Sequence, residues 1–291
     1  MRVTRINIAK ADIISLFEGL PKRVHKHSDI RQTLSDNRGF WRLAMSTTVD
    51  AFISFLLDET KLKKLRLDFP HRTEIRYTWG DVSTYELALS LRPNCYYTHY
   101  TAVYLHELTD QVPKTIYLNH EQPPKRHRDS DLDQARIDMA FRRPVRISKN
   151  IAGYDDQRIC LLNGMHTGGT GVVEIRGRVG ETIRVTNVER TLIDITVRPV
   201  YAGGVFEVLK AYRLAKDKVS VNKLAATLVK LNYIYPYHQA VGFYLEKAGV
   251  YKQSLIDLVH RFEKKFDFYL VHNMKDVDYS KQWRLFFPKG F

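Results

Sequence analysis

The chain has 291 residues, and 44% of them are hydrophobic, so it is long and apolar enough to bury a core and is not globally disordered. No uninterrupted apolar run approaches the length of a membrane span, and the N-terminal residues lack the apolar segment of a secretion signal. We therefore expect a cytoplasmic protein without membrane contact. Two cysteines, Cys95 and Cys160, are too few for a disulfide framework or a cysteine-based zinc site.

Charge is the most informative bulk property of the chain. Lysine and arginine outnumber aspartate and glutamate by 46 to 32, which gives a formal net charge of +14. A surplus of this size favours polyanionic partners, of which nucleic acid is the commonest, although an inert basic surface gives the same number. Residues 1–85 hold 15 basic and 10 acidic side chains, so no single tail carries the charge. Whether the charge indicates nucleic-acid binding therefore depends on where the basic residues lie in the fold.

Three short helices are predicted at the start of the chain. Ile8–Leu20 has apolar residues at helical spacing and ends at Pro21. Ser28 is expected to cap a second helix through Arg31–Leu34. The run Ser46–Thr48 then opens a third helix, which has an apolar face.

A β-hairpin follows the third helix. After Thr60 the basic and apolar residues alternate with a period of two, Pro70–Thr73 turns the chain, and Glu74–Trp79 returns as a second strand that ends at Gly80. Three helices followed by a hairpin is the element order of a winged helix-turn-helix domain. We assign this domain to residues 1–82.

The charges of this first unit lie where a winged helix contacts DNA. Ser46, Thr47 and Thr48 occupy the N-terminus of the third helix, which would face base edges and phosphates in the major groove. Alternatively the unit is a generic small domain or binds protein, the hydroxyls are an ordinary helix cap, and the hairpin charges are a solvated edge. The candidate phosphate contacts are Lys22, Arg23 and Lys26 in the connector and Lys61, Lys63, Lys64, Arg66, Arg72 and Arg76 in the hairpin.

Residues 83–291 are predicted to form a second, larger region that mixes helices and strands, of the α/β (α+β) class. Ser83 or Thr84 caps its first helix, and a second helix spans Tyr96–Leu105. Strands are expected at Lys114–Asn119, Val145–Ile147, Ile159–Leu162, Val172–Ile175 and Ile183–Val185, followed by helices at Asn187–Ile195, Gly204–Lys216, Val221–Leu231, Pro236–Ala248 and Gln253–Lys265.

The helix at Asn187–Ile195 contains a dense group of polar residues. Thr186 or Asn187 caps it, and Arg190 and Asp194 are spaced to pair on its surface. Every feature of the segment is explained by helix formation, so a scaffold is the favoured interpretation. The alternative is that Arg190, Asp194 or Arg198 lines a site.

Other chemistry-like motifs have simpler explanations. The eleven histidines lack a completing ligand set, so we predict neither a metal site nor a catalytic residue nor a cofactor. The loop Gly164–Gly171 lacks the lysine of a phosphate-binding loop, and a glycine-rich hairpin is expected instead. The aromatic run Tyr233–Tyr244 could stack on bases, but helical spacing favours packing.

Three blocks of sequence resemble one family, the AbiEi-type antitoxins of abortive-infection toxin–antitoxin systems. They are TAVYLHELTDQVPKTIYL (Thr101–Leu118), IRVTNVERTLIDITVRPVYAGG (Ile183–Gly204) and the winged-helix segment that ends in RYTWG (Arg76–Gly80). The resemblance extends over about two-thirds of the chain. It marks Arg190, Thr191, Asp194, Arg198, Gly203 and Gly204 as the motif of an antitoxin domain.

The resemblance implies a transcriptional autorepressor whose winged helix binds double-stranded operator DNA. The larger domain would counteract a cognate nucleotidyltransferase-like toxin, often without a stable complex. The sequence supports two other function classes more weakly. One is an enzyme that acts on nucleic acid or modifies the toxin, and the other is a protein-interaction module whose basic surface meets an acidic toxin.

Overall fold

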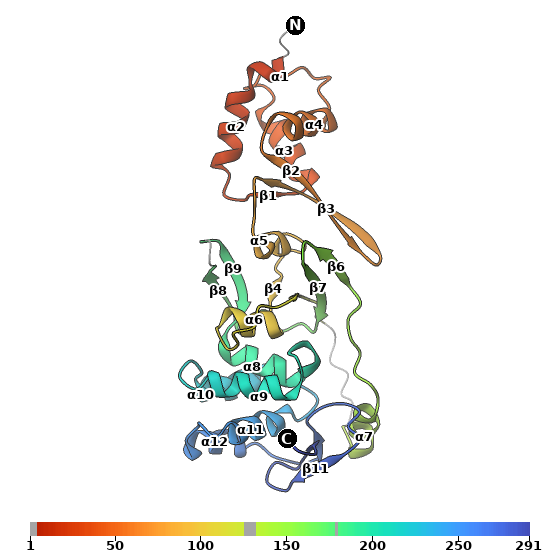
Figure 1. Cartoon of the computed structure of the whole chain (residues 1–291), viewed down its shortest axis with the longest axis vertical. Coiled ribbons are helices and arrows are strands. Elements are labelled where there is room, and N and C mark those ends of the chain that lie inside the picture. Colours follow the sequence, from red (N-terminus) through yellow and green to blue (C-terminus); the bar gives the residue numbers. More distant parts are fainter. Residues whose placement is uncertain (1–4, 125–131, 178–179) are drawn as a thin grey trace.

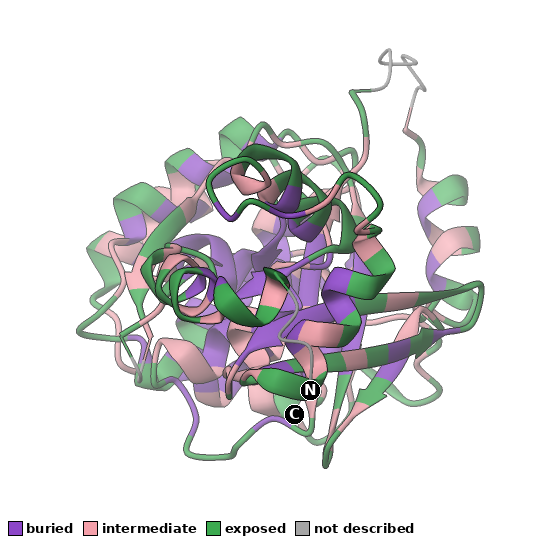
Figure 2. Cartoon of the chain, turned by 90° about the horizontal axis from the view of Figure 1, so that it is seen from above, coloured by how far each residue is buried: buried purple, intermediate pink, exposed green. Residues whose placement is uncertain are grey.

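The computed structural model describes residues 5–124, 132–177 and 180–291. The fold is mixed α/β, as the sequence predicts, and it stacks three parts along its longest axis (Figure 1). A helical N-terminal unit lies at one end, a six-stranded sheet lies in the middle, and a helical layer with a small sheet forms the other end. Buried residues gather in the middle of the molecule and exposed residues on its outside (Figure 2).

The N-terminal unit has the predicted order of helices followed by a hairpin. Ser28 does not cap the second main helix, because that helix already begins at His27, and the Asp29 carboxylate accepts from the Lys26 amide at 2.8 Å. Ile13, Phe17, Phe52 and Leu56 are among the side chains of its core. The elements are α1 (Arg5–Ile8), α2 (Lys10–Gly19), β1 (Val24–His25), α3 (His27–Asn37), α4 (Val49–Glu59), β2 (Leu62–Phe69) and β3 (Arg72–Trp79).

The hairpin of β2 and β3 has two faces with different neighbours. Its strands pair from Leu62 opposite Trp79 to Phe69 opposite Arg72, which confirms the predicted hairpin. Leu62 and Trp79 pack on the helices of the N-terminal unit, whereas Leu67 and Phe69 belong to the apolar core of the central sheet. The core of the central sheet therefore includes residues from both sides of the predicted boundary at residue 82.

The central sheet has the strand order β6-β7-β5-β4-β9-β8, with parallel pairs β5–β7 and β4–β9 and the other neighbours antiparallel. Tyr96–Tyr97 is a strand and not the start of a helix, and Val145–Ile147 is irregular. The loop 165–171 is not a hairpin, because β7 and β8 lie far apart in the sheet. The elements are α5 (Thr84–Leu89), β4 (Tyr96–Tyr97), α6 (His99–Leu105), β5 (Thr115–Glu121), α7 (Gln134–Arg142), β6 (Ile151–Tyr154), β7 (Gln157–Gly164), β8 (Val172–Arg176) and β9 (Thr182–Thr186).

The remaining elements and α7 form the helical layer, whose core includes Phe141, Leu192, Tyr212, Val241 and Tyr244. The burial of Tyr237, Val241 and Tyr244 agrees with packing as the role of that part of the aromatic run. The elements are α8 (Val188–Val197), the 3-10 helix η1 (Pro199–Tyr201), α9 (Val205–Leu214), α10 (Val221–Leu231), α11 (Tyr237–Ala248), α12 (Gln253–His260), β10 (Phe268–Tyr269), β11 (Val277–Ser280) and β12 (Leu285–Pro288).

Candidate nucleic-acid interface

The N-terminus of α4 is the best-defined feature of the N-terminal unit. The hydroxyl of Thr48 accepts a hydrogen bond from the Ala51 amide at 3.1 Å, which makes Thr48 the cap of the helix. The guanidinium of Arg38 donates to the carbonyls of Ala44 at 2.6 Å and Thr47 at 3.0 Å. The turn before α4 is thereby fixed, with Ser46 exposed and Thr47 half-buried beside the helix end.

The solvent-facing side of α4 carries no cation. Asp50 lies 3.2 Å from the ring of His27, Asp58 accepts from the Ser54 hydroxyl, and Glu59 pairs with Lys10 on α2. Carboxylates along this helix oppose close contact with phosphates over its whole length. If α4 meets DNA, it does so with its N-terminal end, and the cations come from neighbouring elements.

Three predicted cations are free to meet phosphate. Lys22, Lys26 and Lys64 are exposed, and none of them forms an ion pair within residues 5–124, 132–177 and 180–291. Lys26 immediately precedes α3, whose first residue, His27, contacts Asp50 at the start of α4. Lys64 lies opposite Tyr77 across the hairpin.

Most of the other predicted cations already have partners. Arg23 donates to the carbonyls of Trp79 and Asp81, and these bonds join the connector to the end of the hairpin. The remaining pairs leave the lysine or arginine side chain 44–70% exposed. They are Lys61 with Glu18 (2.9 Å), Lys63 with Asp81 (2.5 Å), Arg66 with Asp68 (2.9 Å) and Arg72 with Glu74 (2.8 Å).

Arg76 is buried between the hairpin and the second region. It is 3% exposed, its guanidinium lies 3.0 Å from the Glu74 carboxylate, and it donates to the carbonyls of Ser90 and Leu91. Arg76 lies on the face of the hairpin that covers the central sheet, so it joins the N-terminal unit to the second region. The period-two pattern indicates that one face is buried but does not tell which surface covers it.

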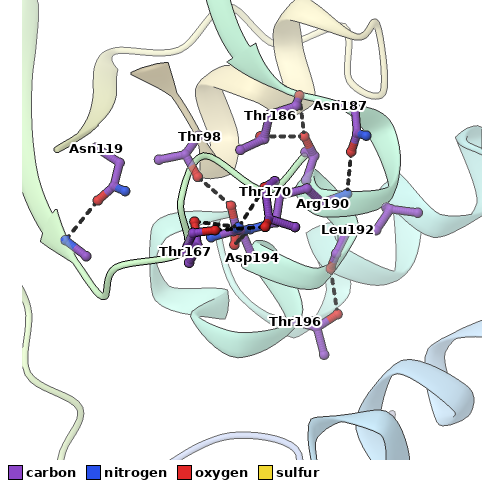
Figure 3. A network of polar contacts seen from close by, with 12 residues as sticks. Thr98, Asn119, Thr167, Thr170, Thr186, Asn187, Arg190, Leu192, Asp194 and Thr196 are labelled. Carbon is purple, nitrogen blue, oxygen red and sulfur yellow. Dashed lines mark hydrogen bonds and ion pairs between the residues drawn. The ribbon is translucent and has the colours of Figure 1, made fainter. Parts of the chain in front are cut away.

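The second region contains a buried polar cluster around α8, drawn in Figure 3. Arg190 and Asp194 pair at 2.7 Å, as the spacing predicts, but they are 5% and 6% exposed and do not lie on the helix surface. Arg190 also donates to the Thr170 carbonyl at 2.9 Å, and Thr98 donates to Asp194 at 2.8 Å. Although burial alone lowers the pKa of Arg190, the Asp194 carboxylate raises it above its ordinary value, so the guanidinium stays charged.

The loop 165–171 covers this pair and is tied to Glu121 at the end of β5. The Glu121 carboxylate accepts from the amides of Thr167 at 2.8 Å and Gly169 at 3.2 Å, and from the Tyr96 hydroxyl at 3.0 Å. Burial by itself raises the pKa of Glu121, but a hydrogen bond from the Thr167 hydroxyl and the three just named outweigh it and place the pKa below its ordinary value. Sequence reasoning missed Glu121, because only the fold brings β5 next to this loop.

The other motif residues build the ends of helices. Thr191 is fully buried, and its hydroxyl bonds to Thr186. The Arg198 amide donates to the Asp194 carbonyl and ends α8. Gly203 and Gly204 have φ angles of 83° and 102°, which favour glycine, and they turn the chain into α9. These four residues therefore shape helix ends, while Arg190 contacts the loop 165–171.

Several site types can be checked directly in the described ranges. Within them no three His, Cys, Asp or Glu side chains gather in a way that could hold a metal ion. None of the helices there combines the length and apolar composition of a bilayer span. Burial lowers the pKa of His99 to about 4, so this histidine is neutral at pH 7.

The fold has a relative of known structure. The chain is similar to the RV2827C protein from Mycobacterium tuberculosis, with a TM-score of 0.59 and 13% sequence identity over 96% of this chain and 90% of that chain. At this identity the likeness shows a shared fold alone. No family model matches the chain, and no curated protein matches it.

Proposed function

We propose that the chain is a DNA-binding antitoxin that represses transcription of its own operon. In this proposal residues 1–82 are a winged helix that binds the operator, and residues 83–291 counteract a nucleotidyltransferase-like toxin. The antitoxin part rests on the sequence resemblance to AbiEi-type antitoxins. The DNA-binding part also has physical support of its own.

One observation carries the DNA-binding proposal. Lys22, Lys26 and Lys64 are exposed without a carboxylate partner in the described residues, in the same small unit as the capped N-terminus of α4. Lysines of this kind neutralise phosphates, while hydroxyls and free amides at a helix N-terminus contact phosphate oxygens or base edges. Contact through the N-terminal end of α4 would use these groups and keep the acidic residues of the helix away from phosphates.

A direct test uses the DNA upstream of the chain's own gene. The full chain should bind this duplex in the presence of excess unrelated DNA, protect a defined stretch from cleavage, and lose affinity steeply as salt rises. Equal affinity for unrelated DNA, without a footprint, would reject operator binding.

The antitoxin role needs a separate test. We expect the neighbouring gene to encode a nucleotidyltransferase-like enzyme, and co-expression of the chain should restore growth that this enzyme alone arrests. A variant with Lys22, Lys26 and Lys64 all changed to Gln should lose the footprint and keep the protection, because the two roles lie in different parts of the chain. Failure of the wild type to protect against that enzyme would refute the antitoxin proposal.

A further inference from the structure

We propose that α4 recognises thymine through its 5-methyl group, and that Phe55 and Ala51 set this preference. The inference rests on the proposed DNA-binding function and deepens it by naming the base. Two features of the molecule support it, namely the composition of α4 and a hollow at the N-terminal end of that helix.

The sequence of α4, VDAFISFLLDE, lacks every residue type that makes bidentate contacts with purines. Arginine and lysine recognise guanine, and asparagine and glutamine recognise adenine, in the major groove. The preceding turn, Leu43–Thr48, also contains none of these four residue types. Apart from Asp50, whose carboxylate lies 3.2 Å from the ring of His27, this end of the helix carries small hydroxyls and apolar side chains. Apolar groups in the major groove contact the thymine methyl.

A hollow of about 350 Å³ lies at the N-terminal end of α4. Ser46 and Thr47 contribute hydroxyls to its lining, and Arg5 contributes a cation. Ala51 is exposed and Phe55 is half-buried, so both are open to a ligand from solvent. The rest of the lining comes from apolar residues of α1, the turn and α4, namely Ile6, Leu43, Ala44, Ala51 and Phe55.

This lining matches one feature of the major groove. The thymine methyl is the apolar group that a base pair presents there, and burying it against Ala51 and Phe55 removes apolar surface from water. The hydroxyls of Ser46 and Thr47 can bond to the adjacent base edges, and Arg5 lies where it can meet a phosphate. Charge complementarity favours DNA over a second copy of this chain, because Lys22, Lys26 and Lys64 of the same unit would repel their own copies.

The experiment compares two versions of the upstream duplex, prepared by polymerase chain reaction with either thymidine or deoxyuridine triphosphate. Deoxyuridine lacks the 5-methyl group and keeps the base pairing. We expect the full wild-type chain to bind the uracil duplex more weakly, by about fourfold for each methyl group that the hollow buries. Affinity for unrelated DNA should not change.

Two variants locate the effect. Phe55→Ala should bind the thymine and uracil duplexes with similar affinity. Phe40→Ala should keep the full difference, because Phe40 is 75% exposed and does not line the hollow. Circular dichroism and thermal unfolding establish whether each variant is folded. The comparison of the thymine and uracil duplexes uses the wild-type chain, so it tests the proposal even if a variant fails to fold.

The outcomes separate the two proposals. Equal binding of the two duplexes by the wild type overturns thymine recognition and leaves operator binding intact. A thymine preference that Phe55→Ala retains overturns the assignment to this hollow. Failure to bind the upstream duplex at all overturns both proposals, and a concentration-dependent dimer that Phe55→Ala abolishes would assign the hollow to a second copy of this chain instead.

Discussion

The N-terminal unit and the region around α8 use charged side chains in different ways. Arg190 and Asp194 form a buried pair whose hydrogen bonds hold the loop 165–171, whereas Lys22 and Lys26 are exposed and have no acidic partner in the described residues. A buried charge needs its partner to offset the loss of hydration, while an exposed cation stays available to a phosphate. Burial and pairing therefore separate charges that maintain the fold from charges that can bind a ligand.

The hairpin contains both a buried cation and exposed cations that are paired with carboxylates. Arg76 is buried against the second region, but Lys61, Lys63 and Arg66 are exposed and paired with carboxylates. An exposed pair is weak and can open, yet its acid remains near and offsets the cation. We therefore expect the paired cations to contribute less to DNA binding than the three free lysines.

The largest effect should come from the buried pair. Asp194→Ala leaves the Arg190 guanidinium buried without a counter-charge, and we expect it to lower the free energy of unfolding by about 3–5 kcal/mol. Chemical denaturation measures this change. Glu18→Ala is the control, since it breaks the exposed pair with Lys61 and should cost less than about 1 kcal/mol. Similar losses in the two variants would contradict a difference between buried and exposed pairs.

The second prediction concerns DNA affinity. Changing Lys22, Lys26 and Lys64 together to Gln should reduce the slope of log affinity against log salt concentration by about 0.9 for each phosphate that these lysines neutralise in the wild type. Fluorescence anisotropy with the upstream duplex measures both affinity and slope. The matched control changes Lys61, Lys63 and Arg66 to Gln, which removes the same charge from the same unit. A larger loss of affinity in the control than in the first triple variant would show that pairing does not decide which cations contact DNA.

The third prediction concerns the cap of α4. Thr48→Ala removes the hydroxyl that accepts from the Ala51 amide and should cost about 1 kcal/mol of stability. Thr48→Ser keeps a capping hydroxyl and should behave like the wild type. Thermal unfolding gives the stability, and binding to the upstream duplex should weaken with Ala but not with Ser. Unchanged stability in Thr48→Ala would mean that the cap contributes nothing.

The smallest effect should come from Glu121→Gln, and it should be present at neutral pH and shrink in acid. The folded pKa of Glu121 lies below its ordinary value of 4.5, so ionised Glu121 adds stability above that value and loses it as pH falls through the folded pKa. Glu121→Gln should therefore flatten the acid side of the curve of stability against pH. Glu174→Gln, at an exposed position on β8, is the control and should leave that curve unchanged. A curve for Glu121→Gln that matches the wild type would rule out this contribution.

The sequence predicted local structure well where periodicity and capping chemistry decide it. Thr48, Ser83 and Asn187 cap helices as expected, and the two strands of the hairpin follow from its alternation. It could not predict contacts that depend on how distant elements pack. The burial of Arg190 requires the loop 165–171 to cross the sheet, and the burial of Arg76 requires the hairpin to cover the central strands.

In the candidate site, too, the sequence predicts local features but not the contacts between distant elements. Residue types and spacing identify Ser46, Thr47, Thr48 and the cations, but they do not show which cations are paired, because Glu18 and Asp81 meet the hairpin only after folding. The hollow beside α4 also depends on α1 and the turn before α4 coming together. Its apolar residues look like ordinary core positions in the sequence.

Hydrogen exchange of the full chain, with and without the upstream duplex, tests the central claim most directly. We predict that DNA slows the exchange of backbone amides in residues 22–31 and 43–54 and leaves residues 186–204 unchanged. Protection confined to residues 186–204, or no protection in the N-terminal unit while the duplex is bound, would contradict the assignment of DNA binding to the exposed lysines and the N-terminus of α4.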